Sequence, residues 1–96
     1  MDFKTTKHDL EEAFTLIVNQ IEEGSLPDVA TANRFSRLAG MMHQLSDETW
    51  MEEAEDFSHL AGQFLNAVKK HDLESCVMLV ESLQDAQSFC HRTFRE

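Results

Sequence analysis

The sequence is poor in the residues that interrupt helices and lacks the pattern that builds strands. Its 96 residues include three glycines and one proline, and no stretch alternates polar with apolar residues. Half-buried strands normally show that two-residue alternation, whereas apolar residues here recur at helical spacing throughout. The sequence therefore predicts an all-α protein.

Long uncharged runs are also missing. Nowhere do about 18 consecutive residues lack a charge, which is the length that a membrane-spanning helix needs. The opening residues Met1–Lys7 do not resemble the apolar part of a signal peptide. The only cysteines, Cys76 and Cys90, lie roughly 21 Å apart along one predicted helix, beyond disulfide reach. Two unpaired thiols fit a reducing compartment, so we expect a cytoplasmic protein.

Basic residues are scarce. Eight lysines and arginines stand against 18 acidic residues, which gives a formal net charge of −10. Such a surface repels nucleic acids and anionic membranes, so neither is an expected partner. The partners that remain are a basic protein patch, a cation or the positively charged face of a cofactor.

Apolar residues at spacings of three and four predict four helices joined by short connections. The expected helices are about Thr5 to Glu23, a second beginning around Ser25–Asp28 and ending near Leu45, about Asp47 to Lys70, and Asp72 to Phe94. Short connections make neighbouring helices antiparallel, which favours an up-down-up-down four-helix bundle. Residues 1–96 are expected to form this single domain.

Four polar or small residues are expected at the helix ends. Gly24 suits the end of the first helix, and Asp72 suits the start of the fourth. Ser25 and Ser46 are expected to cap the second and third helices at their N-termini. These assignments place the helix boundaries given above.

Each predicted helix carries one apolar face for a shared core. The expected core residues are Leu10, Phe14, Ile17, Val18, Ile21, Phe35, Leu38, Ala39, Met42, Leu45, Trp50, Ala54, Phe57, Ala61, Phe64, Val68, Leu73, Cys76, Val80, Leu83, Gln87, Cys90 and Phe94. Phenylalanines can fill the interior of so small a bundle, so we expect a closed core. Gln87 is expected to point toward the core with its amide hydrogen-bonded.

The last helix ends on Gln87-Ser88-Phe89-Cys90-His91-Arg92-Thr93-Phe94-Arg95. This ending resembles the Cys-x-x-Cys-His-x-x-Phe-Arg of cytochrome c prime, where two cysteines bond to haem and the histidine ligates the iron. Cys90 matches the second cysteine and His91 the ligand, whereas Gln87 occupies the place of the first cysteine. The b-type four-helix-bundle cytochrome, whose last helix carries a ligating histidine before x-x-Tyr-Arg, is also similar.

The ending resembles more fully the XXXCH-domain family, small bacterial proteins that keep only the Cys-His of that motif. The resemblance implies a cytochrome c prime-like bundle without covalently attached haem. It also implies association with a gene set that includes ATP-grasp and CofD-like proteins, which become possible partners. It identifies no catalytic residue.

These observations predict a non-enzymatic cytoplasmic binding or accessory module with an unknown protein partner, present as a monomer or homodimer. No Ser/His/Asp or Cys/His pattern for nucleophilic catalysis occurs, and no glycine-rich phosphate loop is present. No resident cofactor is expected. The alternative is a protein that binds noncovalent haem, or transfers electrons, through His91 with Cys90 beside it.

Two further patterns involve His59. Asp56 and His59 have the carboxylate-x-x-His spacing of metal sites in bundles, but the pattern occurs once, so no metal site is expected. The segment His59-Leu60-Ala61-Gly62 is similar to a histidine phosphotransfer motif, although its glycine lies one position early and a nearby lysine is missing. A signalling domain using an exposed His59 is therefore the second alternative.

The segment from Asp47 to Asp56 contains six acidic residues and no basic one. Such runs are ordinarily solvated helix faces. If Trp50 or Met51 is exposed, these two residues together with Glu52 and Glu53 form an apolar patch with an acidic rim. That patch is the predicted partner surface.

Overall fold

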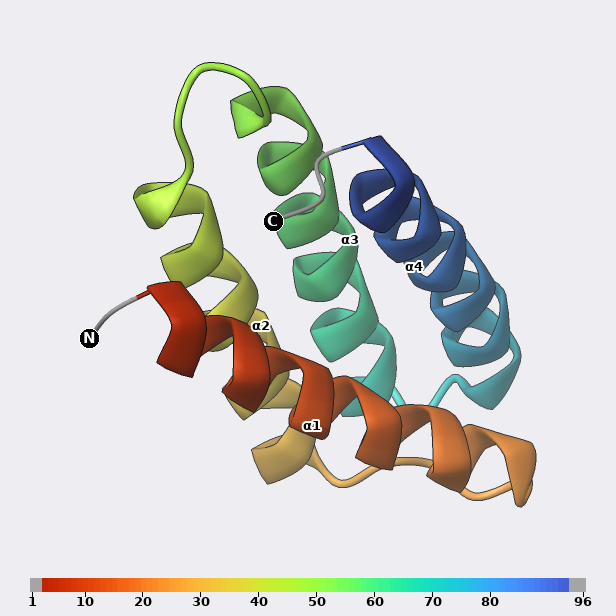
Figure 1. The fold of residues 1–96 in the computed structure, drawn as a ribbon. Coiled ribbons are helices and arrows are strands. Elements are labelled where there is room, and N and C mark those ends of the chain that lie inside the picture. Colours follow the sequence, from red (N-terminus) through yellow and green to blue (C-terminus); the bar gives the residue numbers. More distant parts are fainter. Residues whose placement is uncertain (1–2, 94–96) are drawn as a thin grey trace.

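The computed structural model describes the backbone of residues 3–93 and the side chains of residues 3–87. It contains four helices, which are α1 (Phe3–Glu22), α2 (Val29–Leu45), α3 (Met51–Lys69) and α4 (Leu73–Thr93). Within this described part there is no strand. Each helix packs against the next one in the chain (Figure 1), so the predicted four-helix bundle is confirmed.

The four sides of the bundle are not equally closed. Helices α2, α3 and α4 lie side by side, and α1 crosses obliquely over them (Figure 1). Helix α1 packs mainly on α2 and touches α4 over a short stretch only. The side between α1 and α4 is therefore the most open one.

Four phenylalanines from three helices, α1, α2 and α3, fill the centre of the bundle. The ring of Phe35 stacks on Phe14 with 5.3 Å between centroids, and it meets Phe57 and Phe64 edge to face at 5.7 and 6.3 Å. Phe35 and Phe64 are fully buried. Such edge-to-face and offset arrangements are the favoured geometries of aromatic pairs, so the predicted phenylalanine core is confirmed for these residues.

Most of the expected core residues are buried or packed against the core, including Cys76, Val80 and Leu83 of α4. Met42 is half-buried, and its neighbour Met41 packs against the core in its place. Leu45 and Leu73 are exceptions, because 41% and 36% of their surface is exposed. Leu45 is the last residue of α2 and Leu73 is the first of α4. Their assignment to the core was wrong, and both lie at the end of a helix, where coverage by neighbouring residues is least complete.

Helix α1 ends as expected at Gly24, which adopts a positive φ of 80°. The N–H of Gly24 donates to the carbonyl of Ile21, and the N–H of Ser25 donates to the carbonyl of Gln20, both at 2.9 Å. These are the two bonds of a Schellman ending. Ser25 therefore completes α1, and its assignment as the cap of α2 was wrong.

Asp28 begins α2 in place of Ser25. Its Oδ1 accepts a hydrogen bond from the N–H of Thr31 at 2.9 Å, which satisfies a free donor of the first turn. Hydrogen bonds to Thr31 lower the pKa of the Asp28 carboxyl. The helix consequently starts at Val29.

Ser46 also closes the preceding helix, since its hydroxyl donates to the carbonyl of His43 in the last turn of α2. Asp47 then accepts a hydrogen bond from the N–H of Thr49 at 3.0 Å and holds a turn. Helix α3 begins only after this turn, at Met51. The expected start of α3 at Asp47 was therefore wrong, because the carboxylate closes a loop of its own.

Asp72 caps α4, as predicted. Its two carboxylate oxygens accept from the hydroxyl of Ser75 at 2.7 Å and from the N–H of Ser75 at 3.1 Å. The hydroxyl of Ser75 is the main cause of the lowered pKa of Asp72, followed by its N–H. The connection from α3 is short because the end of one helix directly precedes the cap of the next.

His71 closes α3 in the manner in which Gly24 closes α1. Its N–H donates to Val68, the N–H of Asp72 donates to Ala67, and φ of His71 is 58°. The left-handed conformation destabilises the folded state by roughly 1–2 kcal/mol when the residue has a Cβ. Glycine avoids this strain, but its more flexible unfolded chain lowers the free energy of unfolding by roughly 0.5–1 kcal/mol. His71→Gly should therefore raise the free energy of unfolding by about 0.5–1 kcal/mol, measured by urea unfolding.

Gly24→Ala provides the matched control. It adds a Cβ at a residue with positive φ, so it should destabilise the protein. A lower urea midpoint for His71→Gly would contradict the strain assigned to His71.

Candidate functional site

The acidic corner, our name for residues Asp47–Asp56, lies where α2 passes into α3. Trp50 directly precedes α3, and its ring packs edge to face on Phe3 of α1, with 5.5 Å between centroids. Trp50 is half-buried, and its ring is supported by α1. Met51 is 42% exposed beside it. The acidic corner thus presents the apolar surface of Met51 beside a Trp50 ring that packs on Phe3.

Five of the six carboxylates of the acidic corner are exposed and Glu53 is half-buried. Glu52 and Glu53 lie in the first turn of α3, where the positive end of the helix dipole stabilises them. The stretch contains no lysine or arginine to neutralise these charges. The predicted residues Trp50, Met51, Glu52 and Glu53 are consecutive at the start of α3, so the exposed Met51 and the half-buried Trp50 have carboxylates as chain neighbours. Their role as a partner surface stays a prediction.

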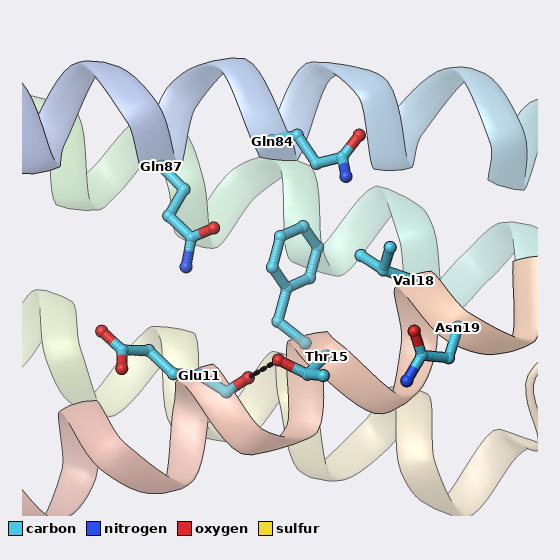
Figure 2. A pocket seen from close by; sticks show the side chains of 7 residues that line it. Glu11, Thr15, Val18, Asn19, Gln84 and Gln87 are labelled. Carbon is cyan, nitrogen blue, oxygen red and sulfur yellow. Dashed lines mark hydrogen bonds between the residues drawn. The ribbon is translucent and has the colours of Figure 1, made fainter. Parts of the chain in front are cut away.

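A second candidate is a cavity of about 330 Å³ between α1 and α4. Phe14 and Val18 line it together with polar side chains of both helices, among them Glu11 and Gln87 (Figure 2). Gln87 projects from α4 toward α1 and is half-buried. Its amide makes no hydrogen bond to another described residue, so the predicted bond is not found. The physical reason is the divergence of α1 from α4, which leaves this amide facing an open cavity.

Cys90 and His91 lie on the last turns of α4, and their side chains are outside the described residues. The cavity between α1 and α4 reaches Gln87, one turn before them. Its volume is near the lower end of the roughly 300–1,000 Å³ that small-molecule pockets occupy. Haem binding at His91 stays the alternative to the predicted absence of a cofactor.

A third candidate, which we call the α2–α3 hollow, has a volume of about 480 Å³. His43 lines it from α2, and residues of α3 supply the remainder, which are Glu55, Ser58, His59, Gly62, Gln63 and Asn66. The Nε2 of His43 lies 3.9 Å from the Oε2 of Glu55 across the two helices. Every lining side chain is polar, and Gly62 leaves open space, since a Cβ there would meet nothing within 4 Å.

Sequence reasoning did not find the α2–α3 hollow. The signal was present in the spacing of Glu55, Ser58, Gly62 and Asn66, because steps of three and four place residues on one helix face. This face lacks large apolar residues, so the apolar periodicity that predicts core residues does not indicate it. Asp56 does not line the hollow, and no group of three metal-ligating side chains occurs within the described part of the chain.

His59 is exposed, as a phosphotransfer site would require. Glu55 lies one turn before it on the same face and lines the same hollow. A carboxylate there repels an incoming phosphoryl group. The surroundings of His59 therefore favour a cation over a phosphate.

Cys76 is fully buried in the core, and burial raises the pKa of its thiol. A neutral thiol in apolar surroundings behaves as a small hydrophobic residue. Cys76 therefore serves packing.

Comparison with known proteins identified no relative, since no family model, curated protein or solved structure matches. Of the helices within residues 3–93, none is both long and apolar enough to cross a membrane. A function is accordingly inferred from the geometry and charge of the three candidate sites.

Proposed function

We propose that this protein is a non-enzymatic binding module whose acidic corner docks a basic segment of a partner protein. The observation that supports the proposal is an exposed Met51 and a half-buried Trp50 in a segment that also carries six carboxylates, five of them exposed. An apolar centre with a charged rim is the usual anatomy of a protein–protein interface. The net charge of −10 extends the same attraction to the whole molecule.

The contact between Trp50 and Phe3 prepares the corner for binding. A side chain that is already held in one position loses little conformational entropy when a partner docks. Tryptophan is also among the residues that contribute most to binding when they lie at the centre of an interface. Trp50 is thus proposed as the anchor, with Glu52 and Glu53 directing the approach of the partner.

The proposal accords with the cytoplasmic accessory role implied by the resemblance to the XXXCH-domain family. ATP-grasp and CofD-like proteins are consequently the first partners to test. Immobilised protein should capture a partner at low ionic strength and release it progressively as salt is added, because exposed charges are screened. Salt-independent capture would contradict the proposal.

Noncovalent haem binding through His91 is the second candidate, supported by the cavity that reaches Gln87. The phenylalanine core leads us to expect no complex. Titration of the protein with haemin and with reduced haem should therefore give no saturable Soret shift. A shift that saturates at one equivalent, and that disappears in His91→Ala, would make the protein a b-type cytochrome.

A further inference from the structure

The α2–α3 hollow continues the surface of the acidic corner. Met51, Glu55, Ser58 and Gly62 follow one another on α3 at steps of four, three and four residues. Residues at these steps lie on one face of a helix. A partner segment that covers the exposed Met51 and extends along α3 therefore reaches the hollow next.

The lining of the hollow is rich in hydrogen-bond acceptors. Glu55 contributes a carboxylate, Ser58 a hydroxyl, and Gln63 and Asn66 contribute amide oxygens. Among the described lining residues there is no lysine or arginine to neutralise Glu55. Arginine presents five N–H donors in a planar fork, whereas the ammonium of lysine is a single charged point with three donors. Acceptors spread around a hollow of this kind suit a guanidinium group.

We propose that the α2–α3 hollow receives an arginine side chain of the partner that docks at the acidic corner. Glu55 forms the charge-assisted hydrogen bond, and the acceptors of α3 satisfy the remaining donors of the guanidinium. This inference rests on the proposed function for its partner, although the hollow itself can be tested without one. The inference predicts the specificity of the hollow. A basic partner segment that places an arginine in the hollow binds more tightly than a segment that places a neutral residue there.

Gly62 keeps the hollow open. A Cβ at this position meets no atom within 4 Å, so the first carbon of a side chain has open space there. Gly62→Leu is therefore the variant chosen to fill the hollow. Glu55→Gln removes the negative charge at nearly constant volume, and the two variants test charge and space separately.

The experiment is an NMR titration of the isotopically labelled protein with arginine amide, repeated with citrulline amide as the neutral isostere. Saturable shifts are expected at Glu55, His59, Gly62 and Asn66 with arginine amide. Glu55→Gln should weaken this binding at least about tenfold, as the loss of a charge-assisted hydrogen bond predicts. Gly62→Leu should weaken it because the leucine side chain occupies the space that the guanidinium needs. Glu81→Gln, an equal charge change on the exposed face of α4, should leave the binding unchanged.

Equal responses to arginine amide and citrulline amide, or unchanged binding in both hollow variants, would overturn the inference. Circular dichroism of Gly62→Leu verifies its fold, and Glu55→Gln supplies an independent answer if that variant does not fold. The acidic corner is judged separately, by partner binding of the Glu52 and Glu53 variants. A partner that requires the corner, without any response of the hollow to arginine amide, refutes this inference and leaves the proposed function standing.

Discussion

Phe35→Ala is expected to lower the free energy of unfolding by about 3–5 kcal/mol, the largest stability change anticipated for a single substitution in this protein. Phe35 is fully buried, and its ring contacts Phe14, Phe57 and Phe64. Truncation removes the buried surface of the ring, ends three aromatic contacts and leaves a cavity between α1, α2 and α3. Domains are stable by roughly 5–15 kcal/mol, so this loss is a large share of the total.

Urea unfolding followed by helical circular dichroism measures this change. Met78→Ala is the control, because Met78 is 63% exposed and its truncation should change stability by less than about 0.5 kcal/mol. Equal midpoints for the two variants would show that Phe35 does not occupy the centre of the core.

Glu52→Lys combined with Glu53→Lys is expected to slow association with a basic partner about tenfold or more at low ionic strength. The two substitutions change the formal charge of the acidic corner from −6 to −2. Charges at the rim of an interface act mainly on the encounter of the partners, so dissociation should change much less. The difference between variant and wild type should shrink as salt is added.

Surface plasmon resonance at low and high salt separates the two rates. Glu74→Lys combined with Glu81→Lys makes the same change in net charge on exposed positions of α4, away from the corner. If this control slows association as much as the corner variant does, the effect belongs to the net charge and the corner is not the docking site. Trp50→Ala should act in the opposite way, through faster dissociation, because it removes the anchor.

The core was predictable because helical periodicity depends only on residues that are close together in the sequence. Phe64 and Leu83 repeat with their neighbours at steps of three and four, and both are fully buried. Gly24 and Asp72 were likewise predictable as helix ends, since their conformational and hydrogen-bonding preferences are local. By contrast, Ser25 and Ser46 were assigned to the wrong helix, because each can serve the end of one helix or the start of the next.

The acidic corner was predictable as a set of residues, but its geometry was not. Six carboxylates without a base are visible in the sequence from Asp47 to Asp56. The contact of Trp50 with Phe3 joins residues far apart in the chain and depends on how α1 crosses the other helices. The cavity at Gln87 has the same origin, because the divergence of α1 from α4 leaves the amide uncovered.

The sequence by itself determined four helices, an aromatic core and a strongly negative surface, because periodicity, side-chain volume and charge are properties of the residues and their near neighbours. The tertiary structure decided where the bundle stays open, which face of Trp50 is covered, and that Glu55, Ser58 and Gly62 border a hollow with His43. These features depend on how helices cross and how closely they approach. Crossing and approach follow from the packing of all four helices together, and no local pattern specifies them.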